Sequence, residues 1–249
     1  MNIYDIPFAD IEEFIECKTN ENHITNFNIS VGVTDSFMEA VEKDEKWELK
    51  FPDVRHELYH SFEGSLEQAE KIGIPLIIYK KVRARELFNR IVAQAHYNGE
   101  PGLLFLDTAN RTNPVPHLYY LESTNPCGEQ WLGPYESCCL GSINLSQFCG
   151  AQNTIQWEEI QKAVETAVIF LDDVINANQF VPAVPMLKEN ALRTRRIGLG
   201  VMGLADLLFH TRIRYGSREG QELASQVIEF IRYHVMQTSI ELAKQRGAF

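Results

Sequence analysis

Residues 124–146 read TNPCGEQWLGPYESCCLGSINLS and lie near the middle of a chain of 249 residues. They belong to a longer stretch, residues 110–142, that is rich in Pro, Gly, Asn and Ser and is therefore predicted to be a loop. Loops of this length inside a compact domain usually carry function. Three of the five cysteines, Cys127, Cys138 and Cys139, lie in this loop, so we expect thiol chemistry there.

Strands and helices alternate on both sides of this loop. Runs of β-branched or apolar residues predict strands over residues 26–34, 47–51, 102–108, 142–148 and 195–203. Apolar positions three and four apart predict helices over residues 9–18, 36–46, 82–99, 157–174, 203–210 and 219–245. Asp35 is expected to cap the second helix, and residues 58–75 are expected to be irregular. The alternation predicts an α/β fold with a mostly parallel sheet.

Charge and cysteine usage exclude several classes of protein. The net charge of −11 offers no positive field to a nucleic acid or an anionic membrane, and no apolar run is long enough to span a bilayer. An odd number of cysteines without a secretory signal argues against a disulfide scaffold and favours a cytoplasmic protein. No metal site is expected, because His56, His60 and His117 lack the spacing of a ligand set.

The pattern N-P-C-G-E places Asn125, Cys127 and Glu129 at alternate positions. In an extended backbone, alternate side chains point to the same side, so an amide, a thiol and a carboxylate would face one volume. Pro126 keeps Asn125 out of the helical region, and Gly128 allows a bend or a close approach. The alternative for these five residues alone is a turn in which a small cysteine packs.

The local charge indicates which form of the Cys127 thiol is favoured. No Lys or Arg occurs between Arg111 and Lys162, whereas carboxylates do occur there. A thiolate needs a nearby cation or a histidine, so this setting favours the protonated thiol, which is suited to hydrogen-atom transfer. Glu129 could then act as a general base toward a substrate hydroxyl, with Asn125 orienting a neighbouring hydroxyl.

Residues 124–146 closely resemble the active-site region of class II, adenosylcobalamin-dependent ribonucleotide reductases. The stretches NFNISVGVTDSFM, GLLFLDTAN, FLDDVINAN and RRIGLGVMGLADLLF agree with that family in order and spacing. The form N-P-C-G-E favours this class over the iron-dependent class. The resemblance implies a ten-stranded α/β barrel of two parallel halves, with a finger loop, here about 110–142, that carries the radical cysteine at its tip.

The resemblance also implies the roles of individual residues. Cys127 would be the thiyl radical that takes the 3′-hydrogen of a ribonucleotide, Glu129 would take the 3′-hydroxyl proton, and Asn125 would hydrogen-bond a ribose hydroxyl. Cys138 aligns with one member of the reducing cysteine pair, whose partner would lie upstream of this chain. Cys139 occupies a position that is usually Asn, while Cys17 and Cys149 are interpreted as packing residues.

The remaining expectations concern the complete enzyme. The chain is expected to be a partial catalytic barrel domain over residues 1–249, truncated at both ends and inactive alone. Adenosylcobalamin is the expected cofactor, with no contact residues assigned, and ribonucleotides, most simply diphosphates, are the expected substrates. A thioredoxin-type or dithiol reductant would act through a missing C-terminal tail, and a homodimer is possible. The alternatives are a fragment of an iron-dependent large subunit and a noncatalytic remnant of a split reductase.

Overall fold

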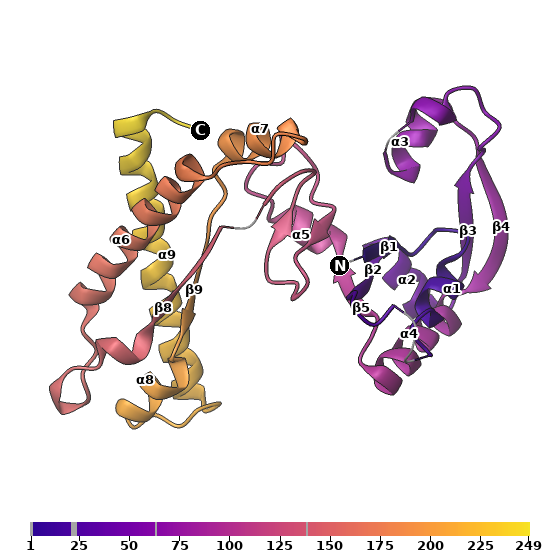
Figure 1. Cartoon of the computed structure of the whole chain (residues 1–249). Helices are drawn as coiled ribbons and strands as arrows, with labels where there is room; N and C mark the ends of the chain where they lie inside the picture. The colour runs from indigo at the N-terminus through magenta and orange to yellow at the C-terminus, as the bar shows by residue number, and fades with distance from the viewer. Residues whose placement is uncertain (1, 21–23, 63, 138) are drawn as a thin grey trace. The chain divides into compact units, whose positions relative to one another are not determined.

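The computed structural model describes the chain except residues 1, 21–23, 63 and 138, and it divides into two compact units. Unit 1 is Met1–Pro134 and unit 2 is Tyr135–Phe249. The boundary falls within the expected finger loop. Both units mix helices and strands (Figure 1), so the expected α/β content is confirmed. The described strands form small separate sheets and do not close a barrel.

The elements are as follows. Unit 1 contains β1 (Asn2–Asp5), α1 (Ile11–Glu16), β2 (Ile29–Val33), α2 (Asp35–Lys43), β3 (Lys46–Pro52), η1 (Tyr59–Ser61), α3 (Leu66–Lys71), β4 (Leu76–Arg83), α4 (Ala84–Asn98), β5 (Gly102–Phe105), α5 (Leu106–Arg111), β6 (Ser123–Thr124) and β7 (Trp131–Leu132). Unit 2 contains β8 (Leu140–Asn144), η2 (Leu145–Phe148), η3 (Ala151–Asn153), α6 (Trp157–Ala177), α7 (Pro185–Thr194), β9 (Gly198–Met202), α8 (Leu204–His210) and α9 (Arg218–Arg246).

A three-stranded parallel sheet forms the centre of unit 1, in the order β1-β2-β5. Every residue of β2 is buried, as expected for a central parallel strand whose two faces are both covered. Phe37 of α2 and Leu87 and Ile91 of α4 are buried in the same apolar cluster as Val31. Helix packing therefore fixes the position of β2.

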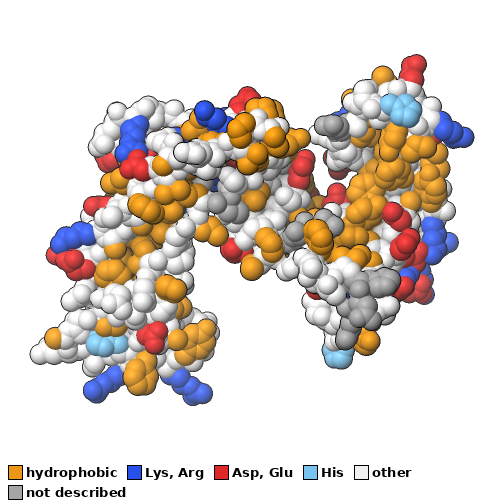
Figure 2. Space-filling model, viewed as in Figure 1, with side chains coloured by type: hydrophobic (Ala, Val, Ile, Leu, Met, Phe, Trp, Pro, Cys, Tyr) orange, Lys and Arg blue, Asp and Glu red, His pale blue; other side chains and the backbone are white. Residues whose placement is uncertain are grey.

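Strands β3 and β4 pair antiparallel, in contrast to the parallel sheet that the sequence predicts. Val82, which was assigned to a helix, lies in β4, and the helix begins only at Ala84. The run over Leu76–Arg83 was missed because most of it is exposed and its lysines interrupt the apolar pattern. Figure 2 shows apolar side chains along this hairpin, where Ile78 and Tyr79 are exposed.

Two further predictions for unit 1 were wrong at helix starts. Residues 58–75 contain a short helix, α3, with a capping box in which Ser65 and Gln68 satisfy each other's backbone N–H groups. Thr34, not Asp35, caps α2, because its hydroxyl accepts a hydrogen bond from the Phe37 N–H. Asp35 is instead the first helical residue, where its charge favours the helix N-terminus.

Unit 2 is built on the parallel pair β8–β9, with the long helices α6 and α9 side by side against it (Figure 1). The buried face of α6 has members three or four residues apart: Ile160, Val164, Val168, Leu171 and Ile175. The apolar Val174 and Ala167 lie at the margins of this face, since Val174 is exposed and Ala167 is only partly buried. No helix among the described residues has both the length and the apolar character needed to cross a membrane.

Candidate functional site

The segment that carries Cys127 is a tight hairpin turn in unit 1. Strands β6 and β7 pair antiparallel, and residues 125–130 connect them. The Asn125 N–H donates to the Gln130 carbonyl at 3.3 Å, and the Gly128 N–H donates to the Asn125 carbonyl at 3.0 Å. Gly128 has φ = +78°, a conformation that costs side-chain-bearing residues energy. Glycine at this position therefore lets the chain reverse.

Asn125 and Glu129 do meet, but the reason predicted for their meeting was wrong. The backbone between them turns and is not extended, so they face each other across the turn. The Asn125 side-chain amide donates to Glu129 Oε1, and Asn125 Oδ1 accepts the Gln130 N–H at 3.1 Å. The amide of Asn125 thus orients the Glu129 carboxylate while its own oxygen is fixed by the backbone.

Cys127 lies between these two residues in the turn and is an exposed free thiol. Pro126, on its N-terminal side, is also exposed. The turn of the alternative interpretation is therefore present, but Cys127 does not pack in it. A substrate atom could reach this sulfur from solvent.

Two carboxyl groups lie near the base of the hairpin. Burial, and then the charge of Glu122, raise the pKa of Asp5 to about 6. Burial also raises the pKa of Glu122, whose backbone N–H donates to the Leu132 carbonyl of β7 at 3.3 Å. The acidic character expected around the loop from the sequence is therefore increased by Asp5, at the end of β1.

Cys138, the expected member of the redox pair, lies outside the described residues. Its neighbours in sequence are anchored in unit 2. The Cys139 carbonyl accepts the Gly198 N–H at 2.9 Å, and its thiol lies 3.6 Å from the Leu171 carbonyl. Burial raises the pKa of the Cys139 thiol, so the protonated form is favoured.

A buried ion pair holds the chain two residues before Cys138. The Glu136 side chain is 1% exposed, and Arg196 Nε donates to both of its carboxylate oxygens at 3.1 and 3.2 Å. The Thr194 hydroxyl donates to Glu136 Oε1 at 2.9 Å. These three side chains and Cys139 line a cavity of about 130 Å³. Arg196 therefore leads into β9 as a largely buried ion-pair partner.

The next arginine in the run is also paired. Arg195 Nε donates to Asp172 Oδ1 at 2.6 Å, and Arg195 Nη1 donates to Asn176 Oδ1 at 3.0 Å. Arg195 is only 19% exposed in its side chain. The sequence signal was present as two acidic residues in the expected helix, but nothing in the sequence indicates which arginine meets which carboxylate.

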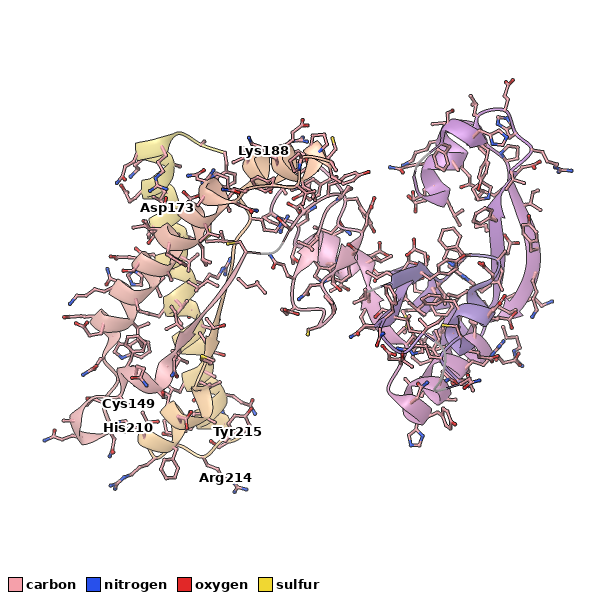
Figure 3. All side chains as sticks on the ribbon, in the orientation of Figure 1. Cys149, Asp173, Lys188, His210, Arg214 and Tyr215 are labelled. Atoms are coloured by element: carbon pink, nitrogen blue, oxygen red, sulfur yellow. The ribbon has the colours of Figure 1, made fainter. Side chains whose placement is uncertain are left out.

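The two remaining cysteines are partly buried. Cys17 ends α1, and burial is the largest cause that raises the pKa of its thiol. Cys149 packs against the apolar cluster of unit 2, near His210, whose Nε2 lies 2.8 Å from the Gly150 carbonyl (Figure 3). No group of three or more His, Cys, Asp or Glu side chains in the described part of the chain is placed to hold a metal ion.

Comparison with protein families identifies the class to which this fold and turn belong. The family model described as "Ribonucleotide reductase, barrel domain" matches residues 1–249. The chain therefore belongs to the ribonucleotide reductase family, and the resemblance found in the sequence is confirmed.

Three relatives show how similar the chain is to individual reductases. The chain is 42% identical to a vitamin B12-dependent ribonucleoside-diphosphate reductase of Thermoplasma acidophilum, over 100% of this chain and 30% of the relative. It is 41% identical to a protein of the same description from Mycobacterium tuberculosis, over 100% of this chain and 33% of the relative. A ribonucleoside-diphosphate reductase subunit alpha of Chlamydia pneumoniae is 31% identical, over 96% of this chain and 24% of the relative. The chain thus spans about a third or less of the length of these relatives.

Proposed function

We propose that this chain is part of the catalytic subunit of a ribonucleotide reductase of the adenosylcobalamin-dependent type, which reduces ribonucleoside diphosphates to 2′-deoxyribonucleotides. The observation that carries the proposal is the contact of Asn125 with Glu129 around an exposed Cys127 thiol. The identity to a relative named as vitamin B12-dependent is 42%, against 31% to a relative named only as a subunit alpha, and this difference favours the adenosylcobalamin-dependent type.

In this proposal Cys127, Glu129 and Asn125 all act on the ribose of one substrate molecule. The Cys127 sulfur, as a thiyl radical, takes the hydrogen from C3′, and Glu129 takes the proton of the 3′-hydroxyl. An amide nitrogen carries two N–H groups. Asn125 can therefore donate one to Glu129 and keep the other for a ribose hydroxyl, so it can hold base and substrate together.

Adenosylcobalamin would supply the initiating radical. No described residue is assigned to its binding, so only the roles of this chain's own residues are derived. Glu129 would take the proton, and the amide hydrogen bond from Asn125 holds its carboxylate in position for that transfer. Water must be kept from the radical, a task that requires the turn to be enclosed in the complete enzyme.

The proposed setting is the ten-stranded barrel of the family, with residues 110–142 as its finger loop and residues 1–249 as part of one catalytic domain. The two parallel sheets, β1-β2-β5 and β8–β9, would be portions of that barrel. Cys138 would be one member of the reducing pair, with its partner in an upstream segment. A dithiol or thioredoxin-type reductant, a cytoplasmic location and a possible homodimer complete the proposal.

The test is deoxynucleotide formation by a reductase in which this chain is completed at both ends. Cys127→Ser is expected to abolish product, because an O–H bond is much harder to break homolytically than an S–H bond. The matched control is Cys149→Ser, which changes a thiol remote from the turn in sequence. This variant should retain most activity. Product formation by Cys127→Ser would contradict the proposal.

The same assay separates the alternatives. Turnover with adenosylcobalamin and a dithiol alone supports the proposed type, whereas a requirement for a second, iron-containing subunit supports the iron-dependent type. A completed protein that makes no product under either condition would be a noncatalytic remnant. The 249-residue chain alone is expected to be inactive.

A further inference from the structure

A side chain just before the central strand of unit 1 reaches the turn that carries Cys127. The Asn28 amide donates to the Pro126 carbonyl at 3.4 Å, across 98 positions in sequence. Asn28 immediately precedes β2, the fully buried central strand. The Pro126 carbonyl belongs to the peptide bond that joins Pro126 to Cys127. Because a peptide unit is planar, a hydrogen bond to this oxygen restricts the orientation of the whole peptide unit that leads into Cys127.

Both neighbours of Asn28 are held by a partly buried ion pair. The Lys18 ammonium donates to the Phe27 carbonyl at 2.5 Å and pairs with the Glu100 carboxylate. Glu100 Oε1 accepts the Ile29 N–H at 3.2 Å. The side chains of Lys18 and Glu100 are only 13% and 23% exposed, so this pair is less screened than a surface pair. Residues 27–29 are therefore fixed on both sides of the Asn28 amide.

The contacts of Lys18 and Glu100 determine what the long hydrogen bond from Asn28 can stabilise. Asn28 is exposed, and a single exposed bond of 3.4 Å stabilises a fold little. Most of the cost of such a bond is the entropy of ordering the groups that make it. In Asn28 the backbone is already ordered by Lys18 and Glu100, so the bond acts mainly on the turn. Its expected effect is on local position and not on global stability.

We propose that Asn28 is a positioning residue for Cys127, which acts by holding the Pro126 carbonyl against the start of β2. This inference rests on the proposed function, in which Cys127 carries the radical. It assigns a role in that chemistry to a residue of the segment NFNISVGVT, far from the N-P-C-G-E turn in sequence. The role requires an amide donor at position 28.

The first experiment measures hydrogen–deuterium exchange of the Gly128 amide in the 249-residue chain. Asn28→Asp is nearly isosteric, but its carboxylate cannot donate to the Pro126 carbonyl and repels it. The expected result is a rise of about fivefold to tenfold in the Gly128 exchange rate, with exchange in β2 and β5 unchanged. Asn28→Gln retains the amide donor on a longer side chain and should restore at least part of the protection.

The matched control is Gln221→Glu. Gln221 is also exposed, and its amide also donates to a backbone carbonyl at 3.4 Å, that of Gly216. Both substitutions add one negative charge and remove one amide donor, but Gln221 belongs to unit 2 whereas the turn belongs to unit 1. Equal Gly128 exchange in Asn28→Asp and Gln221→Glu would overturn the proposal, as would faster exchange throughout β2 in Asn28→Asp.

The second experiment measures turnover in the completed reductase. Asn28→Asp is expected to lower kcat by about tenfold to a hundredfold with KM within about twofold, because small misplacement of a reacting group is costly. Gln221→Glu should leave both constants near those of the parent. If the parent makes no product, the proposed function fails; if the parent is active and Asn28→Asp matches Gln221→Glu, only the positioning role fails.

Discussion

The segments that carry Cys127 and Cys139 are held in different ways. The turn around Cys127 is closed by bonds among residues 125–130, and its thiol is exposed. The segment before β8, which leads to Cys139, is fixed by the buried Glu136 carboxylate and Arg196, 60 positions further along the chain. A locally closed turn can present a side chain to a ligand. A segment fixed through a distant ion pair depends on the fold of its whole unit.

The largest expected effect comes from breaking the ion pair of unit 2. Glu136→Gln removes the negative charge of a largely buried ion pair, at a cost of about 3–5 kcal/mol in the free energy of unfolding. Urea unfolding followed by Trp157 fluorescence, with the other two tryptophans replaced, reports on unit 2. Glu222→Gln, in the exposed Arg218–Glu222 pair, is the control and should cost less than about 1 kcal/mol. Equal losses of unfolding free energy in Glu136→Gln and Glu222→Gln would contradict the conclusion that a buried ion pair fixes the segment before β8.

The next effect tests whether the Cys127 turn depends on its own backbone. Gly128→Ala places a side chain at φ = +78°, with open space around the added carbon, so the cost of about 1–2 kcal/mol arises from the backbone alone. Trp131, which follows the turn, provides the fluorescence probe for urea unfolding. Gly200→Ala in unit 2, followed by Trp157 fluorescence, should cost less, because the nearest atom would lie 3.6 Å away and φ is not positive. A stability loss no greater than that of Gly200→Ala would show that the turn tolerates other conformations.

Thiol reactivity compares the two segments directly. Cys127 is expected to react with iodoacetamide at least about tenfold faster than Cys139 at pH 8, because burial raises the pKa of the Cys139 thiol. Fragment-ion mass spectrometry of the modified peptide separates the two sites. Full denaturation should bring the rates together. Similar rates in the folded chain would contradict the contrast in burial.

The smallest effect is a pH dependence of unit 1 near the base of the turn. Because the pKa of Asp5 is about 6 in the folded chain and 3.8 by reference, the folded state binds more protons between these values. Stability should therefore fall as pH rises from about 4 to about 6, and Asp5→Asn should reduce that slope. Comparison with the parent isolates Asp5 from Glu122, whose raised pKa acts in the same direction. An unchanged slope would indicate that Asp5 is solvated.

The contrast between local and distant bonding also explains what the sequence could predict. Glycine at position 128 and the amide–carboxylate pair of the turn are encoded within six residues. The sequence predicts the proximity of Asn125 and Glu129, but it predicts an extended backbone where the structure has a turn. The helix over Trp157–Ala177 was recognised from its apolar period. By contrast, β4 is defined by its pairing with β3, and the partner of Arg196 by the packing of unit 2. Such pairings have no local signature.

The dipeptide Arg195–Arg196 has a consequence for how this region can vary. Arg195 adopts a left-handed conformation, with φ = 44°, and the two adjacent guanidinium groups go to different acidic partners, Asp172 on α6 and Glu136 before β8. Inserting or deleting one residue beside Arg195 or Arg196 would turn at least one of the two guanidinium groups away from its acidic partner. We therefore expect length changes between α7 and β9 to be far less tolerated than length changes in the exposed connection between α6 and α7.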